Sequence, residues 1–299
     1  MNHIQISKAQ TNSTQIAKTP TKPALKWVGG KTQLLDKLQP KMPKQFGKYI
    51  DPFMGALAIP LKLNPERAVL CDANKELVIT HCAIRDNVDK VIAALKKHKD
   101  NEGYFRSLRA KDWRKMPPHC VAARMIFLNK TCFNGLYKVN KKGGFSVAYG
   151  KTGVSRSVLN EDNLRAVSHA LQGYEIIHQD FRETLKQAEP NDVVFLDPPY
   201  HDTFSTYTIT GFSEQDQVDL ATEFDRLSQL GCHVITTNSN HEFIHQLYAE
   251  HTIDVVDVRR SINCKANKRK GTEVIITPNR QVACRSIAAN DDIALSECA

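Results

Sequence analysis

The stretch VVFLDPPY, residues 193–200, decides the fold class of this 299-residue chain. Its first four residues form a short continuous apolar run, which is typical of a strand buried on both faces. Pro198 restricts Asp197 to an extended conformation, and Pro199 stiffens the next step of the backbone. The stretch therefore predicts a buried strand of a parallel sheet that ends in a rigid, polar corner.

Six further apolar runs predict strands. They lie at residues 49–53, 68–71, 175–178, 233–237, 253–258 and 273–277. Helical patterns lie before and between them, at residues 31–38, 74–85, 159–171 and 213–230. Strands that alternate with helices favour the α/β class, here a Rossmann-like, doubly wound and mostly parallel sheet of about seven strands.

One region interrupts this alternation. Its helical patterns, followed by a Gly-rich polar segment, lie at residues 88–99, 104–114 and 120–128. We therefore expect a discontinuous core at residues 24–85 and 159–280, with a mainly helical insertion at residues 86–158. Residues 1–23 and 281–299 are expected to be tails.

Basic residues are concentrated in the insertion. Residues 96–156 contain 15 Lys and Arg against three acidic residues, although the whole chain has a net charge of only +9. A second cluster at residues 259–271 has six basic residues and no acidic one. Such stripes suit a polyanion such as nucleic acid. The alternative is a solvated basic face.

Composition places the chain among globular proteins, with 41% hydrophobic residues. No run approaches the ~18 apolar residues that span a bilayer, and the first 23 residues lack a signal-peptide hydrophobic stretch. We therefore expect a cytoplasmic protein that does not bind membranes. The eight cysteines have no zinc-type spacing, which predicts reduced thiols and no metal site.

Polar residues also follow the first two predicted strands. The motif DPFMGALA has Gly55 in a tight turn, and an acid about 20 residues further on, Asp72 in CDAN, typically binds a ribose hydroxyl of an adenosine cofactor. The full G-x-G-x-x-G motif is absent, and a helix N-cap is the alternative role for Asp72. A phosphate loop at Gly30-Lys31-Thr32 is excluded, because the glycine required five positions before Gly30 is Leu25.

The Asp-Pro-Pro-Tyr corner is rich in acceptors. Its two prolines lack N–H groups, so the corner offers the Asp197 carboxylate, bare carbonyls and the ring of Tyr200. A flat ligand with an NH2 group fits it, because both N–H bonds can point at acceptors while the ring stacks on Tyr200. That arrangement makes an exocyclic amine nucleophilic. An ordinary surface turn is the alternative.

Six motifs occur in the order and spacing of the Dam-type DNA adenine-N6 methyltransferases, which the chain resembles over about residues 24–278. The motifs are LKWVGGK, YIDPFMGALAI, LCDAN, TCFNGLYKVNKKGGFSVAYGK, QDF and LDPPY. The resemblance implies S-adenosylmethionine as the cofactor and double-stranded DNA as the partner. It also implies a Rossmann-like methyltransferase core with a DNA-recognition insertion, with or without a cognate restriction endonuclease.

The resemblance assigns roles to particular residues. Those implied at the cofactor are Trp27, Lys31, Asp51, Phe53, Gly55, Asp72, Asp180, Phe181 and Asp197. Those implied to hold a flipped-out adenine for catalysis are Asp197, Pro198, Pro199 and Tyr200. A recognition hairpin maps onto residues 133–150, and its implied DNA contacts are Phe133, Asn134, Leu136, Lys138, Asn140, Lys141 and Lys142.

Three positions depart from the family pattern. Leu57 replaces a second glycine of the cofactor loop, and a branched side chain there is expected to exclude the left-handed conformation and crowd the cofactor. Lys138 replaces an arginine that reads the first guanine of GATC, and Ala148 replaces a proline. We therefore expect a site related to GATC with relaxed preference at its first base. The alternatives are a methyltransferase of an RNA base or protein amide, and a DNA-binding relative without catalysis.

Overall fold

The computed structural model of the protein describes residues 21–27, 29–151, 156–201, 211–259 and 270–279. Most of the second basic cluster, residues 260–269, and nearly all of the two expected tails lie outside the described residues. The described part contains a seven-stranded sheet in the order β3-β2-β1-β4-β5-β7-β6. Its strands are β1 Tyr49–Asp51, β2 Ala68–Cys71, β3 Glu175–Ile177, β4 Val193–Leu196, β5 His233–Ser239, β6 Thr252–Arg259 and β7 Lys270–Thr277.

Strands β1 to β5 are parallel to one another. Strand β7 is antiparallel to both β5 and β6. This arrangement confirms the expected α/β class and mostly parallel sheet. The strand order changes direction between β1 and β4, and in open α/β sheets such a switch point, at the carboxyl ends of the strands, is where ligands bind.

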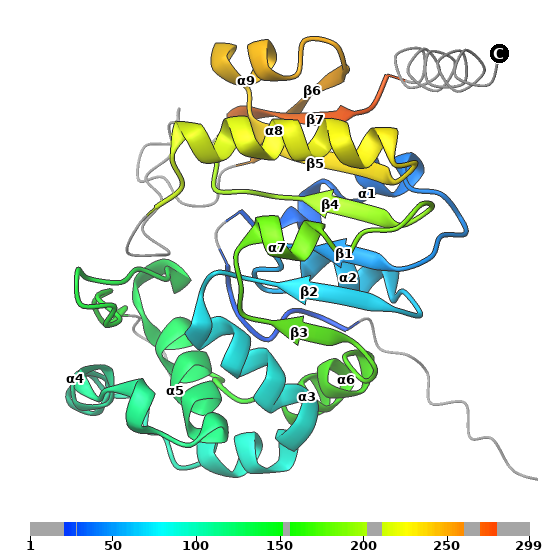
Figure 1. Ribbon diagram of the computed structural model, residues 1–299. Coiled ribbons are helices and arrows are strands. Elements are labelled where there is room, and N and C mark those ends of the chain that lie inside the picture. Colours follow the sequence, from blue (N-terminus) through cyan, green and yellow to red (C-terminus); the bar gives the residue numbers. More distant parts are fainter. Residues whose placement is uncertain (1–20, 28, 152–155, 202–210, 260–269, 280–299) are drawn as a thin grey trace, which may run out of the picture.

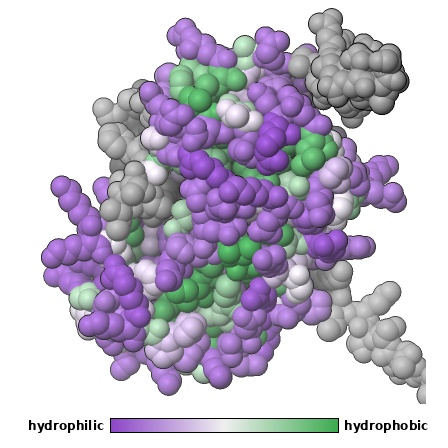
Figure 2. All heavy atoms as spheres, in the orientation of Figure 1, coloured by the Kyte–Doolittle hydropathy of each residue, from purple (hydrophilic) through white to green (hydrophobic). Residues whose placement is uncertain are grey.

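Helices cover both faces of the sheet (Figure 1). They are α1 Leu35–Leu38, α2 Ala58–Leu63, α3 Lys75–Leu95, α4 Glu102–Ala110, α5 Pro118–Thr131, α6 Glu161–Ala170, α7 Phe181–Leu185, α8 Glu214–Gln229 and α9 Glu242–Leu247. Single 3-10 turns are η1 Lys31–Gln33, η2 Gln39–Lys41, η3 Trp113–Lys115 and η4 Phe133–Gly135. Hydrophilic side chains cover much of the face in Figure 2, with hydrophobic atoms visible toward its middle.

Alternation along the strands builds two cores. Tyr49, Val193 and Phe195 pack with residues of α1 to α6. Ile50 and Val194, one residue out of step, pack with α7, α8 and α9 on the other face. Successive strand side chains point to opposite faces, so each apolar run contributes to both cores. This two-sided burial is what the uninterrupted apolar run at residues 193–196 predicts.

Helix α3 contains the break that the sequence pattern predicts. The two helices expected at residues 74–85 and 88–99 are two helical segments that meet at a kink, where Asn87 has non-helical dihedral angles (φ −144°, ψ 43°). Leu77, Ile84 and Val91 are buried at a seven-residue spacing along it, so one apolar stripe continues through the kink. The boundary expected at residue 86 therefore lies next to the kink between the two segments.

A buried ion pair joins α3, α5 and the chain after η4. Arg124 Nη1 lies 2.5 Å from Glu76 Oε1, and both side chains are almost fully buried. The Tyr137 hydroxyl donates to the other oxygen of Glu76 at 3.0 Å. Arg124 also donates to the carbonyls of Leu108 and Arg109, so its charge is well satisfied. These bonds fix the segment around Tyr137 against the helices.

Candidate active site

A cavity of about 1130 Å³ lies where β1, β2 and β4 end. Every residue implied at the cofactor or in catalysis lines it: Trp27, Lys31, Asp51, Phe53, Gly55, Asp72, Asp180, Phe181, Asp197, Pro198, Pro199 and Tyr200. Adjacent parallel strands present their carboxyl ends at one edge, so three motifs that are far apart in the sequence meet there. The structure thus brings both predicted sets into one site.

Asp197 is held by two donors. Lys31 Nζ lies 2.7 Å from its Oδ1, and Thr237 Oγ1 on β5 donates to the same oxygen at 2.8 Å. Lys31 Nζ also donates to the Gly29 carbonyl at 2.6 Å, which fixes the ammonium group. Burial raises the pKa of the Asp197 carboxyl, and the Lys31 charge opposes that rise. Both donors bind Oδ1, which leaves Oδ2 available to a ligand.

The backbone after Asp197 is held by a buried amide pair. Gln217 Nε2 on α8 donates to the Pro199 carbonyl at 2.8 Å, and Asn238 Nδ2 on β5 donates to Gln217 Oε1 at 3.0 Å. Asn238 Oδ1 accepts from the backbone N–H of His201 at 3.2 Å. The corner is therefore fixed by side chains on both its flanks, and one of its two proline carbonyls is occupied.

Tyr200 lies beside Lys31 and Glu273. The Lys31 ammonium is 4.7 Å from the centroid of the Tyr200 ring, within the range of a cation–π contact. The Tyr200 hydroxyl donates to Glu273 Oε2 on β7 at 2.7 Å. Burial raises the pKa of Tyr200 well above its usual value, and the charges of Asp197 and Glu273 add to this, so the phenol is a donor at neutral pH.

Two further carboxylates lie at the ends of β1 and β2. Asp51 accepts from the Phe53 N–H at 3.0 Å and from the Tyr49 hydroxyl at 3.2 Å. Burial raises the pKa of Asp51 to about 8 and that of Asp72 to about 6. Among the described residues, no ion pair includes either carboxylate. The cavity therefore offers carboxyl groups that a bound cation would ionise, which suits a cationic ligand.

Asp72 connects the two loops rather than capping the helix. Its carboxylate accepts from the Gly55 N–H at 3.2 Å and from the Asn74 N–H at 2.8 Å. The N-cap of α3 is Asn74, whose side chain accepts from the Leu77 N–H. Gly55 has φ 47°, and a Cβ there would lie 3.1 Å from the Trp27 ring, so the turn requires glycine.

The structure contradicts the expectation that Leu57 excludes the left-handed conformation. This residue adopts the left-handed conformation, with φ 69° and ψ 28°, at the start of α2. Its side chain is fully buried in the core and is not among the residues that line the cavity. Burial of a large apolar side chain offsets the steric cost of left-handed backbone, which is about 1–2 kcal/mol.

Three aromatic rings form one wall of the cavity. The centroids of Phe53 and Phe181 are 5.6 Å apart, and that of Phe212 lies 5.8 Å and 5.7 Å from these two rings. Phe212 was not expected, because it stands alone before the N-cap of α8 without a motif around it. No motif surrounds three other residues of the site either, so the sequence has no local signal for Gln217, Thr237 or Glu273.

Residues 131–150 form an antiparallel hairpin, as expected. Bridges pair Cys132 with Tyr149 and Val139 with Phe145, and a tight turn is closed by the Asn140 N–H donating to the Gly144 carbonyl at 2.9 Å. The ring centroid of buried Tyr137 lies 5.1 Å from that of Trp27, which lines the cavity. The hairpin therefore touches the wall of the cavity.

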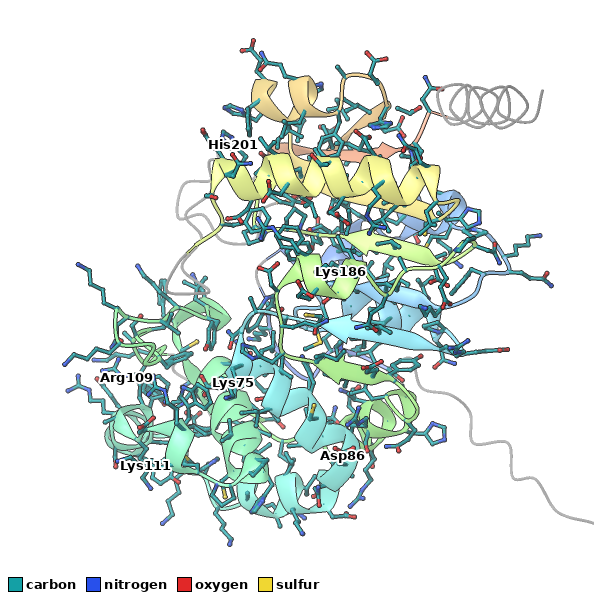
Figure 3. The ribbon with its side chains drawn as sticks, in the orientation of Figure 1. Lys75, Asp86, Arg109, Lys111, Lys186 and His201 are labelled. Carbon is teal, nitrogen blue, oxygen red and sulfur yellow. The ribbon has the colours of Figure 1, made fainter. Side chains whose placement is uncertain are left out.

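The residues implied to contact DNA lie outside the large cavity. Phe133 is 50% exposed, Asn134, Lys138, Asn140, Lys141 and Lys142 are also exposed, and Leu136 is half-buried. A smaller cavity of about 450 Å³ between α4 and the hairpin is lined by Arg106, Arg109, Arg114, Asn140 and Lys142. Figure 3 shows Arg109 and Lys111 in the helical part of the molecule, away from His201 beside α8.

Some features are absent from the described residues. Within residues 21–279, apart from the gaps stated above, no group of three His, Cys, Asp or Glu side chains could hold a metal ion. In that same part of the chain no helix is long and apolar enough to cross a membrane. The five cysteines it contains, at positions 71, 82, 120, 132 and 232, are free thiols.

The sheet order and the polar cavity at its switch point define a Rossmann-like methyltransferase. The family of D12 class N6 adenine-specific DNA methyltransferases matches residues 27–262, and the chain belongs to this family. It is therefore an adenine-specific DNA methyltransferase, as the sequence motifs indicated.

Curated relatives support this assignment. The type II methyltransferase M.MjaIII of Methanocaldococcus jannaschii is 34% identical, over 83% of this chain and 95% of the relative. The type II methyltransferase M1.LlaDCHI of Lactococcus lactis subsp. cremoris is 33% identical, over 89% of this chain and 98% of the relative. A DNA adenine methylase of Haemophilus influenzae is 28% identical, over 85% of this chain and 92% of the relative.

Proposed function

We propose that the protein transfers a methyl group from S-adenosylmethionine to N6 of an adenine flipped out of duplex DNA. The observation that supports this most strongly is the corner at the end of β4. There a fixed carboxylate, a proline carbonyl and an aromatic ring face one cavity.

The cavity fits this cofactor chemically. Asp51 is buried and Asp72 partly buried, and both carboxylates have raised pKa values and no ion pair among the described residues. S-adenosylmethionine has a sulfonium and an ammonium group, and it supplies an electrophilic methyl group whose bond to sulfur breaks as the bond to N6 forms. We propose that Asp51 and Asp72 bind the cationic part and the ribose, and that Phe53, Phe181 and Phe212 pack against its adenine ring.

The corner orients the target amine. Pro199's carbonyl is occupied by Gln217, so the Pro198 carbonyl, on the cavity wall, is the acceptor that remains beside Asp197. When one N–H of the amine donates to each acceptor, the N6 lone pair is turned out of conjugation with the adenine ring. N6 can then attack the methyl carbon in line with its bond to sulfur. The methylated amine then loses its extra proton, and the Asp197 carboxylate lies within reach to accept it. Tyr200 stacks on the base and offsets part of the flipping cost of a few kcal/mol.

The hairpin and the basic helical region at residues 86–158 are proposed to bind the duplex. Lys138 has an exposed side chain, while its carbonyl accepts from the Ser146 N–H at 2.8 Å, so its backbone is fixed and its ammonium is free to reach a base edge. We propose a site that is GATC or a relative of it, with lysine at the position that reads the first guanine. The basic side chains around it contact phosphates.

A filter assay with a labelled methyl group tests this function. Duplex DNA, single-stranded RNA and a mixed protein fraction are each incubated with the protein and labelled S-adenosylmethionine. We expect label in duplex DNA alone. Label in RNA or protein would support the alternative substrates, and DNA binding without any transfer would support a catalytically inactive relative.

A further inference from the structure

Glu273 is a further carboxylate of the cavity, and no sequence motif points to it. It lies on β7, in register with Ser239 of β5 and Val256 of β6. Ile275, two residues further on, packs in the same core as Phe195. Glu273 therefore points to the same face of the sheet as Asp197, because side chains two apart in a strand share a face.

Glu273 and Lys31 hold Tyr200 at two places. The hydroxyl donates to Glu273 Oε2 at 2.7 Å, while the Lys31 ammonium lies 4.7 Å from the ring centroid. One contact fixes the rim of the ring, and the other occupies a face. Since a tyrosine ring is oriented by two torsions, the two contacts together restrict the orientation in which the ring lines the cavity.

A role in stability does not account for this carboxylate. Among the described residues, no ion pair includes Glu273. Its charge adds to the effect of burial in raising the pKa of Asp197, so the two carboxylates repel each other. A further negative charge in a cavity that already contains Asp51, Asp72 and Asp197 is unfavourable for folding. Its contact with Tyr200 is the interaction that offsets this cost.

We propose that Glu273 is a positioning residue for base capture, which holds the Tyr200 hydroxyl so that the ring is ready to stack on the flipped adenine. This inference rests on the proposed function, because it takes the flipped base as the partner of Tyr200. Glu273 acts through Tyr200 and does not touch the reacting atoms.

A double-mutant cycle on the full-length protein tests the inference. Glu273→Ala and Tyr200→Phe remove the same hydrogen bond from its two ends. Each is expected to slow single-turnover methylation of duplex DNA about tenfold, the net value of one hydrogen bond. Because the bond is shared, the double variant is expected to be no slower than the slower single variant. Glu273→Gln keeps an acceptor oxygen and is expected to recover most of the rate.

A second readout separates positioning from folding. 2-Aminopurine at the target position fluoresces when it leaves the stack, and we expect Glu273→Ala to reduce that increase while S-adenosylmethionine affinity, measured by calorimetry, is unchanged. Asp257→Ala is the matched control, because it removes a carboxylate from an exposed position on neighbouring β6. If Glu273→Ala melts below the assay temperature, the two remaining variants decide: the inference requires a slowed Tyr200→Phe and a nearly wild-type Glu273→Gln, and a wild-type rate for Tyr200→Phe would overturn it.

Three results would overturn the inference. The first is multiplicative slowing in the double variant, and the second is a wild-type rate and fluorescence increase for Glu273→Ala. In both cases the wild-type enzyme still flips and methylates adenine, so the proposed function stands. The third is a wild-type protein that produces neither the fluorescence increase nor methylation, which would overturn the proposed function as well.

Discussion

Asp51 and Asp72 connect burial to cofactor binding at the scale of single residues. Their pKa values rise to about 8 and about 6 because burial disfavours the charged carboxylate. A bound cation reverses this effect, since it favours the ionised forms. The same burial that is unfavourable for the free protein therefore prepares the cavity for a positively charged ligand.

We expect S-adenosylmethionine binding to release protons near pH 7. Asp51, with a pKa of about 8, is mostly protonated at that pH and ionises when the cation binds. Affinity should therefore rise as the pH increases from 6 to 9. Calorimetry in two buffers of different ionisation enthalpy measures the proton release, and an Asp51→Asn variant should lose most of it. Identical heats in both buffers for the wild type would contradict the assignment.

The sign of the stability effect follows from the same pKa values. Both carboxyls have folded-state pKa values above their unfolded value of about 4, so their contribution to stability is present below pH ~4. It is lost as the pH rises through about 6 for Asp72 and about 8 for Asp51. The protein without cofactor should thus melt at a lower temperature at pH 9 than at pH 6, and Asp51→Asn should weaken that dependence.

Motifs next to strand ends made much of the site predictable. Asp51, Asp72 and Asp197 each follow a recognisable apolar run, and parallel strands bring such ends together. Glu273 reaches the site because β7 inserts antiparallel between β5 and β6, which depends on pairing across the whole sheet. Gln217 lies on an ordinary amphipathic helix. Nothing local distinguishes either residue from its neighbours.

At the scale of elements, the turn into α2 depends on an unfavourable backbone conformation. Leu57→Gly relieves the left-handed strain of about 1–2 kcal/mol, but it removes a buried leucine side chain, which costs about 3–5 kcal/mol. We expect a net loss of about 1–4 kcal/mol in the free energy of unfolding. Denaturant unfolding measures it, with Leu61→Ala, buried in α2 without left-handed backbone, as the control.

Cofactor affinity distinguishes a Leu57 side chain that only packs in the core from one that crowds the cofactor. Leu57 does not line the cavity, so Leu57→Gly should leave the dissociation constant for S-adenosylmethionine unchanged. Tighter binding by the variant would show that the side chain does obstruct the cofactor.

The hairpin predicts how specificity can be changed. Arginine binds O6 and N7 of guanine with a rigid fork, whereas lysine reaches them as a flexible point charge. Lys138→Arg should therefore sharpen discrimination at the first base by about 1–3 kcal/mol, which is about 5- to 150-fold. Sequencing of N6-methyladenine in DNA from cells that express each form measures this. Strictly GATC-confined methylation by the wild type would contradict the relaxed preference.

The short helices were the least predictable part of the fold. Helices α2, α7 and α9 have five or six residues, too few for a helical period to stand out from the sequence. The two halves of α3 meet at the kink at Asn87, within two residues of the break that the sequence pattern predicts. The longer strands and α8, with its Ser213 capping box, were predicted within a few residues.

Charge is separated at the scale of the whole molecule. The cavity is lined by buried carboxylates, while the helical region and hairpin present exposed basic side chains. Duplex affinity should fall steeply with salt, because bound Lys and Arg release counterions from DNA, whereas cofactor binding involves no such release.

Lysines of the hairpin provide a test of that separation. Replacing Lys141 and Lys142 by alanine should lower the slope of log affinity against log salt by about 2, roughly one for each phosphate that is no longer neutralised. Lys186→Ala, at the C-cap of α7 on the other face of the sheet, is the control and should not change the slope (Figure 3). An unchanged slope in the hairpin variant would place the DNA elsewhere.

The central claim is that the corner around Asp197 methylates adenine N6 in duplex DNA. Nucleoside mass spectrometry after a single turnover tests it most directly, with the wild type and Asp197→Ala compared at equal duplex occupancy. We predict N6-methyldeoxyadenosine as the product of the wild type and at least a thousandfold less from Asp197→Ala. Duplex binding should change by only a few fold, because the carboxylate acts on N6 rather than on phosphates. A different methylated nucleoside, or full activity in the variant, would contradict the account.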